Sequence, residues 1–226
     1  MKIIKIPYIQ GDGIGQEITD VTLKLVSDAV NKYYGQDYKI QWIELLAGEK
    51  AFQQTGEYLP KETIEGLKNH SVAIKGPLMT PVGQGFRSLN VQLRQTLDLY
   101  ACYRPVKHYC GVTSPIKYPE QVDLHIFREN TEDIYAGIEF MQRSEENEKM
   151  KNFLLNELKI KNILFPDTTA IGVKPISEQG SKRLVRAAIQ FAVDNNLPTV
   201  TLVHKGNIMK FTEGAFCQWG YAVAQE

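Results

Sequence analysis

A short segment between residues 83 and 94 carries polar and cationic side chains at a spacing that suits an anion. A glycine-rich loop leads into a predicted helix whose N-cap is Ser88. The first turn of a helix has free N–H groups and a partial positive charge, so it attracts carboxylates and phosphates. Asn90 and Arg94 are four residues apart and share one face of this helix. The segment therefore predicts a carboxylate-binding helix end.

Two further arginines extend this prediction. Arg104 follows a tyrosine and precedes a proline, and Arg128 follows a predicted strand. The guanidinium group is suited to bidentate binding of a carboxylate. The alternative is that Arg94 pairs with Asp98 on the helix surface while the other two arginines are solvated. For each arginine taken singly, the residues alone favour that alternative.

A glycine motif lies between the first predicted strand and the first predicted helix. Gly11, Gly13 and Gly15 alternate with other residues, which resembles part of a dinucleotide-binding fingerprint. That fingerprint needs G-x-G-x-x-G, and Gln16 occupies the place of its last glycine. We therefore interpret the motif as a tight turn between strand and helix.

The elements that must position these residues alternate between strands and helices. The apolar spacing predicts strands at 3–9, 39–45 and 71–75 and helices at 16–34 and 60–68, followed by a glycine- and proline-rich loop at 76–85. This alternation is typical of an α/β domain.

The later part of the chain predicts a less regular arrangement. We expect a strand at 122–128, a helix that begins at Ser177 and runs to about 195, a strand at 199–204 and a helix at 212–224. The stretch 142–150 is polar and reads as an exposed turn or helix end, and 133–176 is the least regular part. The last residues read as the middle of an amphipathic helix, which is the pattern expected of a partial sequence.

Composition narrows the function classes. The 226 residues include 26 Lys+Arg and 26 Asp+Glu, so the formal net charge is zero. A nucleic-acid or membrane partner would favour a basic excess, so neither is expected. Three cysteines without a C-x-x-C motif argue against a disulfide framework or a zinc site. We find no signal-peptide pattern and no apolar run long enough to cross a membrane, so a cytoplasmic protein is expected.

Five motifs, in the same order along the chain, resemble NADP-dependent isocitrate dehydrogenases of the bacterial type. These enzymes belong to the isocitrate/isopropylmalate dehydrogenase family. The motifs are IQGDGIG at 9–15, KGPL at 75–78, RSLNVQLR at 87–94, FRENTEDIYAG at 127–137 and VHKGNIMK at 203–210.

The resemblance implies oxidative decarboxylation of isocitrate to 2-oxoglutarate and CO₂ with NADP⁺, a step of the tricarboxylic acid cycle. By resemblance, isocitrate is bound by Ser88, Asn90, Arg94, Arg104, Arg128 and Asn207. Tyr135 and Lys205 match the catalytic pair: Lys205 helps to remove the hydroxyl proton through a relay, and Tyr135 delivers a proton to C3. From the residues alone, a packed aromatic and a solvated loop lysine would be the preferred interpretations of these two.

The substrate class has an alternative within the family. The 3-isopropylmalate and homoisocitrate dehydrogenases share the malate-like core of the substrate but meet a different substituent. Ser88 and Asn90 match the positions that face the extra carboxylate of isocitrate. An isopropyl group would leave these polar side chains buried without partners, at a cost in desolvation, so isocitrate is favoured.

The resemblance also implies a fold with a large α/β domain, a small α/β domain and a clasp between subunits. We expect residues 1–99 in the large domain, 100–132 and 178–226 in the small domain, and 133–177 in a clasp that holds a homodimer. Lys205 and Asn207 would then act in the neighbouring subunit's site.

Cofactor contacts are only partly represented. Met79 and Thr80 match a loop beside the nicotinamide, but Met79 replaces a family threonine, so Thr80 is the better candidate. The ligands of Mg²⁺ or Mn²⁺, and the loop that binds the 2′-phosphate of NADP, are expected beyond Glu226.

Two expectations concern activity and regulation. We expect the 226-residue chain alone to be inactive. The alternative is a natural short chain that binds substrate or dimerises without catalysis. Ser88 resembles a serine that a dedicated kinase phosphorylates in bacterial enzymes, with a phosphatase reversing the effect. A phosphate there would occupy the place of the substrate carboxylate.

Overall fold

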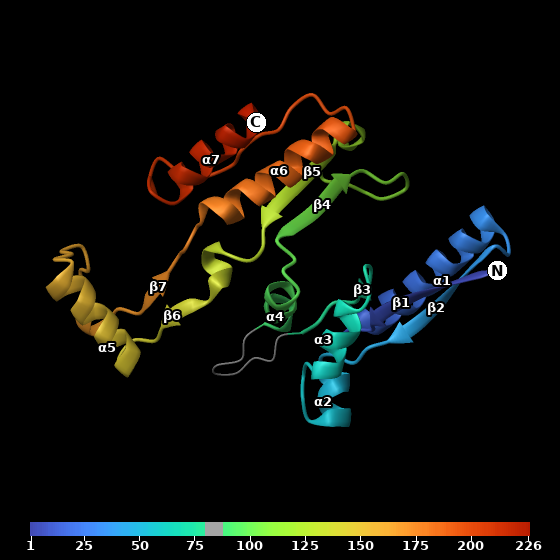
Figure 1. Cartoon of the computed structure of the whole chain (residues 1–226), viewed down its shortest axis with the longest axis horizontal. Coiled ribbons are helices and arrows are strands. Elements are labelled where there is room, and N and C mark those ends of the chain that lie inside the picture. Colours follow the sequence, from blue (N-terminus) through green and yellow to red (C-terminus); the bar gives the residue numbers. More distant parts are fainter. Residues whose placement is uncertain (80–87) are drawn as a thin grey trace. The chain divides into compact units, whose positions relative to one another are not determined.

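Two compact units divide the chain, Met1–Leu99 and Tyr100–Glu226. The computed structural model describes residues 1–79 and 88–226 (Figure 1). Each unit combines strands with helices, so the α/β class that the sequence predicts is confirmed.

The first unit is built on a parallel sheet of three strands in the order β2-β1-β3. These are β1 (Lys2–Ile9), β2 (Tyr38–Glu44) and the short β3 (Ile74–Lys75). Parallel neighbours need a crossover connection, and α1 (Gly15–Tyr34) provides it between β1 and β2. All four elements were predicted, although β3 has two residues instead of five.

Three short helices complete this unit: α2 (Glu49–Thr55), α3 (Lys61–Lys68) and α4 (Leu89–Thr96). The α3 helix follows Pro60, as its proline-first composition predicts. The α2 helix was not predicted. The core of the unit is apolar and consists of Ile9, Ala47, Leu78, Leu89 and Leu93.

The glycine motif forms the tight turn that we predicted between β1 and α1. Gly11 and Gly13 have φ values of 87° and 55°, a region that favours glycine. The backbone N–H of Asp12 donates to the carbonyl oxygen of Pro77 at 2.7 Å. A Cβ atom on Gly11 would lie 2.3 Å from that same oxygen, so the turn needs glycine for space as well as for conformation.

The second unit contains an antiparallel pair, β4 (Ala101–Lys107) and β5 (Asp123–Glu129), with the helices α6 (Glu178–Asp194) and α7 (Glu213–Gln225). The predicted start of α6 is confirmed, because the Ser177 hydroxyl accepts the N–H of Gly180 at 2.9 Å. The predictions of β5 and α7 are also confirmed, whereas β4 was not predicted.

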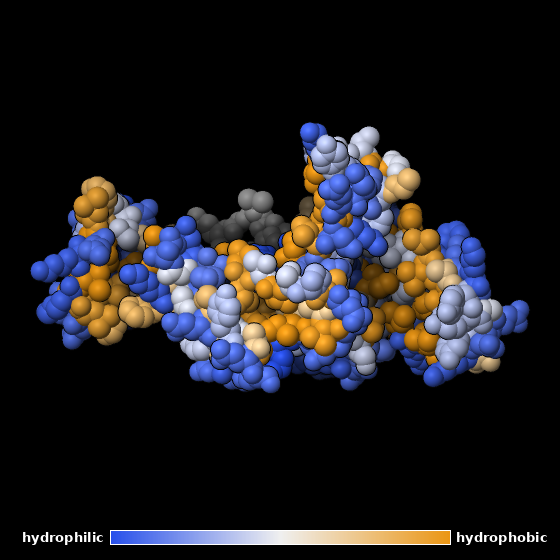
Figure 2. All heavy atoms as spheres, turned by 90° about the horizontal axis from the view of Figure 1, so that it is seen from above, coloured by the Kyte–Doolittle hydropathy of each residue, from blue (hydrophilic) through white to orange (hydrophobic). Residues whose placement is uncertain are grey.

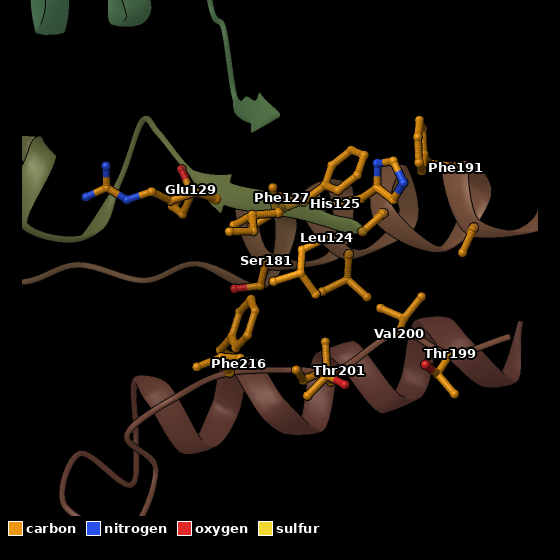
Figure 3. A pocket seen from close by; sticks show the side chains of 18 of the residues that line it. Leu124, His125, Phe127, Glu129, Ser181, Phe191, Thr199, Val200, Thr201 and Phe216 are labelled. Atoms are coloured by element: carbon orange, nitrogen blue, oxygen red, sulfur yellow. The ribbon is translucent and has the colours of Figure 1, made fainter. Parts of the chain in front are cut away.

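The strand predicted at residues 199–204 is wrong for the described chain. A strand exists only where its N–H and C=O groups pair with a neighbour, and no such pairing forms there among the described residues. A cavity of about 770 Å³ is lined both by β5 and by residues 199–203. Figure 3 shows Val200 and Thr201 beside α7 and facing Leu124 of β5 across this space.

Residues 133–177 contain more regular structure than predicted. The strands β6 (Ile138–Phe140) and β7 (Ile171–Val173) form an antiparallel pair, and α5 (Glu145–Asn152) lies between them in sequence. A π-helical turn at Phe153–Glu157 extends α5, and 3₁₀ turns occur at Pro119–Gln121, Asp133–Ala136 and Pro166–Thr168. Within the described ranges, no helix is long and apolar enough to cross a membrane.

Gly76 gives a direct test of the packing around the first sheet. A Cβ atom there would lie 2.1 Å from the carbonyl oxygen of Gln10 and 2.6 Å from Oγ1 of Thr19. We expect Gly76→Ala to lower the free energy of unfolding by roughly 1–3 kcal/mol, because backbone and a hydrogen-bonded threonine must move. Urea denaturation of the purified chain measures this.

The matched control is Gly172→Ala in the second unit. Its added Cβ would meet only the carbonyl oxygen of Ile138, at an ordinary contact distance of 3.8 Å. Its effect should stay within about 0.5 kcal/mol. Equal stability of the two variants would contradict the account of Gly76.

Candidate active site

The α4 helix presents its polar side chains because its apolar ones are fixed in the core. Leu89 and Leu93 are 1% and 4% exposed and lie one turn apart. They hold α4 against the first sheet, so Ser88, Asn90 and Arg94 occupy its other sides, where each is half-buried.

Ser88 takes the predicted N-cap position of α4. Among the described residues its hydroxyl makes no capping hydrogen bond, and its carbonyl oxygen accepts the N–H of Gln92 at 3.0 Å. The Asn90 amide donates to the carbonyl oxygen of Leu78 at 3.3 Å. Asn90 therefore ties the start of α4 to the segment before Met79, and its contact with a substrate stays a prediction.

Asp12 is a residue of this site that sequence reasoning missed. It is 8% exposed, and its two oxygens accept backbone N–H groups from Glu49 (2.8 Å) and Met79 (2.9 Å). Charge-assisted hydrogen bonds of this kind fix a loop firmly. The Met79 side chain itself is exposed, and the other predicted cofactor contact, Thr80, lies outside the described residues.

Lys75 was also missed as a candidate. Its side chain is exposed as a whole, but its ammonium folds back and donates to the carbonyl oxygen of Gly76 at 2.8 Å. Desolvation of the ammonium lowers the pKa of Lys75, and the nearby positive charge of Arg94 lowers it further, while Asp12 acts in the opposite direction. The first unit therefore gathers two mutually repelling cations, an arrangement that a bound anion would relieve.

The register of β4 and β5 places two predicted arginines on one face of the second unit's sheet. Arg128 lies directly opposite Cys102, and Arg104 is two residues from Cys102 on the same strand. Side chains two residues apart along a strand, and those directly opposite, point to the same side. The two arginines are thus diagonal neighbours, roughly 7–8 Å apart in such a pair.

The other face of this sheet is occupied by aromatic side chains. Tyr103 and Phe127 pack against Phe191 of α6, with ring centroids 5.1 and 5.3 Å away. The Tyr103 hydroxyl also lies 2.7 Å from Nδ1 of His125. This packing orients the sheet on α6 and leaves the arginine face turned away from the helix.

Arg128 and Tyr135 are in direct contact. The guanidinium donates a hydrogen bond to the tyrosine hydroxyl, and its carbon lies 4.6 Å from the centroid of the ring. Both side chains are half-buried. The structure therefore joins a predicted substrate-binding residue to a predicted catalytic one.

Acidic residues of the same motif shape the loop between these two. Oε1 of Glu129 accepts the N–H groups of Thr131 (2.7 Å) and Glu132 (3.1 Å), and Oε2 of Glu132 accepts the N–H of Ser177 (2.8 Å). These carboxylates are occupied by backbone groups. Glu129 and Glu132 of the motif at 127–137 therefore stabilise the loop itself and need not contact a ligand.

Lys205 and Asn207 lie on an exposed turn before α7. The backbone N–H of Lys205 donates to Oε2 of Glu213 at 2.8 Å, and its carbonyl oxygen accepts N–H groups from Ile208 and Met209, both at 3.1 Å. The turn is therefore well fixed while the side chains of Lys205 and Asn207 face solvent.

The large cavity of the second unit is not itself a fitting anion site. Arg128 and Tyr135 line it, but most of the lining is apolar, including Leu124, Phe191 and Phe216 (Figure 3). An unpaired carboxylate is costly to bury among such side chains. In the described part of the chain, no three His, Cys, Asp or Glu residues gather as metal ligands, so these residues do not fit a metal.

The state of Lys75 can be measured by acylation of its amine. Only the neutral amine reacts, and a lowered pKa increases the neutral fraction at a given pH. We expect Arg94→Met to move the labelling of Lys75 by acetic anhydride to higher pH, because one positive charge is lost. Peptide mass spectrometry reads the labelling, and Arg94→Lys, which keeps the charge, should leave it almost unchanged. Identical pH curves for Arg94→Met and the unaltered protein would count against the coupling.

Comparisons with known proteins assign the chain to one family. The family model described as isocitrate/isopropylmalate dehydrogenase matches residues 5–226. The NADP isocitrate dehydrogenase of Staphylococcus epidermidis is 59% identical over 219 residues, which cover 97% of this chain and 52% of that protein. The enzyme of the same name from Helicobacter pylori is 56% identical, covering 98% of this chain and 54% of that protein.

Solved structures give the same result. The crystal structure of isocitrate dehydrogenase from Methylococcus capsulatus aligns with a TM-score of 0.79 at 36% identity, covering 98% of this chain and 57% of that one. A β-decarboxylating dehydrogenase from Thermococcus kodakarensis aligns with a TM-score of 0.65 at 25% identity, covering 98% of this chain and 54% of that one. The chain spans about half the length of the curated relatives it matches. By sequence and by fold, the chain belongs to the isocitrate/isopropylmalate dehydrogenase family.

Proposed function

We propose that the protein, at the full length of these relatives, oxidises and decarboxylates isocitrate to 2-oxoglutarate and CO₂ in the cytoplasm, as a step of the tricarboxylic acid cycle. The observation that carries the proposal is the hydrogen bond between Arg128 and Tyr135. Arg128 shares its face of the β4–β5 sheet with Arg104. Relatives at 56–59% identity that are named NADP isocitrate dehydrogenases support the same reaction.

The proposed roles follow from charge and position. Isocitrate is a trianion, and the guanidinium groups of Arg94, Arg104 and Arg128 are the proposed partners of its carboxylates. Tyr135 donates a proton to C3 after CO₂ has left. The guanidinium of Arg128 beside its hydroxyl then stabilises the negative charge that remains on the oxygen.

Lys205 begins the reaction in this proposal by helping to remove the hydroxyl proton while hydride leaves C2. Hydride transfer needs NADP⁺ as the acceptor, and Met79 and Thr80 are the proposed contacts beside its nicotinamide. The Mg²⁺ or Mn²⁺ of the family is part of the proposal.

Isocitrate is favoured over 3-isopropylmalate by the polar start of α4. Ser88 and Asn90 are half-buried there, and an isopropyl group would remove water from them without replacing its hydrogen bonds. A carboxylate can accept from both side chains and from the first N–H groups of the helix.

A homodimer is the proposed assembly, with Lys205 and Asn207 acting in the neighbouring subunit's site. Lys205 is flanked by apolar side chains that are almost fully accessible, Val203 at 86% and Phe211 at 93%. Residues 133–177, the proposed clasp, expose Leu164 and Phe165 at 80% and 66%. Apolar atoms appear on the lobe that holds α5, at the left of Figure 2. Surfaces of this kind are typical of subunit contacts.

The first experiment tests the reaction itself. The full-length protein should reduce NADP⁺ with isocitrate and Mg²⁺, and the 226-residue chain should be slower by at least about 1000-fold, the order of loss expected when groups that stabilise the transition state are missing. Absorbance of NADPH measures both. The full-length protein should also prefer isocitrate to 3-isopropylmalate in kcat/KM. Equal turnover by the short chain, or a preference for 3-isopropylmalate, would contradict the proposal.

A second experiment tests Ser88 as a point of control by a kinase and phosphatase. In the full-length protein, Ser88→Asp should lower kcat/KM for isocitrate by at least about 100-fold, because like charges brought together cost several kcal/mol. The control is Ser114→Asp in the exposed loop between β4 and β5, where an acidic side chain can still accept the N–H of Ile116 and kcat/KM should stay unchanged. A Ser88→Asp enzyme with normal kcat/KM would remove the basis for regulation at this residue.

A further inference from the structure

We propose that Lys174 and Glu213 are positioning residues that hold the segments of Tyr135 and Lys205 in one arrangement. The inference rests on the proposed function, because it assumes that these two side chains carry the proton transfers. Neither Lys174 nor Glu213 was singled out by the sequence motifs. Their contacts join three stretches that are distant in sequence: the 3₁₀ turn Asp133–Ala136, residues 174–177 and the start of α7.

Lys174 is the centre of the connection. Its ammonium forms one ion pair with Glu213 and a second with Oδ1 of Asp133 at 3.2 Å. The exposed fractions of the side chains are 23% for Lys174, 14% for Glu213 and 31% for Asp133, so each is largely covered. Partly buried ionic groups that satisfy one another are costly to break singly, because a partner is left without compensation.

Glu213 extends the connection to Lys205. One of its oxygens meets Lys174, and the other accepts the backbone N–H of Lys205 at 2.8 Å. The Lys205 turn also rests directly on α7, since a Cβ atom on Gly206 would lie 2.9 Å from Cα of Gly214. The carboxylate of Glu213 thus fixes the peptide group from which the Lys205 side chain leaves the chain.

Asp133 extends the connection to Tyr135, two residues later. Asp133 has a φ of 62°, an unfavourable conformation for a residue with a side chain, and its Oδ1 accepts the N–H of Ile134 at 2.6 Å. Its own N–H donates to the carbonyl oxygen of Pro175, next to Lys174. The ion pair with Lys174 therefore supports the turn that carries Tyr135.

The electrostatics keep this connection intact over a wide pH range. The hydrogen bond from Lys174, and then that from the Lys205 N–H, lower the pKa of Glu213, so its contribution is lost only as pH falls through that lowered value. The hydrogen bond to Glu213 raises the pKa of Lys174, so its contribution is lost only as pH rises through that raised value. Both groups stay ionised between about pH 5 and pH 10.

The effect of a substitution on kcat distinguishes an ion pair that only stabilises the fold from one that positions catalytic side chains. Loss of a structural contact lowers stability and leaves the kcat of the folded protein unchanged. Loss of positioning lowers kcat while KM for isocitrate stays nearly constant, because substrate binding depends on the arginines. A misplacement of about 1 Å can cost roughly 100-fold in rate.

The test uses the full-length protein. We expect Glu213→Ala and Lys174→Met to lower kcat about 10- to 100-fold, with KM for isocitrate changed less than about 3-fold. Lys174→Arg should recover much of the loss by keeping the charge. Glu213→Gln should not, because an amide whose oxygen accepts the Lys205 N–H turns its NH₂ group toward the Lys174 ammonium. Hydrogen exchange at the Lys205 amide should be faster in Glu213→Ala than in the unaltered protein.

Two control variants separate positioning from stability. Asp28→Asn removes an exposed ion pair with Lys24 on α1 and should leave kcat unchanged; the side chains of Asp28 and Lys24 are 58% and 77% accessible. Val185→Ala truncates a side chain that is 2% exposed and should lower the melting temperature without lowering kcat.

The outcomes distinguish this inference from the proposed function. If the unaltered full-length protein does not oxidise isocitrate, or if Lys205→Ala keeps full activity, the proposed function fails and this inference fails with it. If the unaltered protein is active and Lys205→Ala is not, the inference alone is overturned by a normal kcat in Glu213→Ala. It is also overturned if Lys174→Arg is no better than Lys174→Met.

Discussion

Carboxylates that accept backbone N–H groups fix three loops beside candidate site residues. Asp12 binds the N–H of Met79, Glu129 binds the loop that leads to Tyr135, and Glu213 binds the N–H of Lys205. Such charge-assisted bonds are short and directional, so they define where a loop begins without using its side chains. The side chains of Arg128, Tyr135 and Lys205 are not used in these bonds. In the proposed function, the loops around a binding site for a trianion would thus be held by carboxylates of the protein itself.

Sequence reasoning succeeded where a pattern is local. The apolar repeat predicted α1, and Ser177, whose hydroxyl caps the helix, predicted the start of α6. It failed for β6 and β7, because strands of three residues are too short to show alternation. It also failed for residues 199–204, whose composition suits a strand that has no neighbour to pair with among the described residues.

The same division applies to the candidate site. Ser88, Arg104 and Arg128 were recognised from their types and from motif resemblance, and the register of β4 and β5 places the two arginines together. Asp12 could not be recognised, because its partner Met79 lies 67 residues away and a lone acid between glycines has many explanations. Glu213 likewise meets Lys174 across 39 residues of sequence. Long-range pairing of this kind becomes visible only when the chain is folded.

Arg104 and Arg128 lie on strands instead of loops, so the ligand-binding role proposed for them would depend on the pairing of the sheet. Side chains alternate between the two faces, so a slip of one residue in β4 would send Arg104 to the side of Phe127 and Phe191, while Arg128 stayed where it is. A molecule with this wrong register would still be compact, but its two arginines would lie on opposite faces of the sheet. The slip would also remove the Tyr103 ring from its packing against Phe127 and Phe191, which costs free energy. The alternation of side chains that keeps rings on one face and arginines on the other therefore also stabilises the correct register.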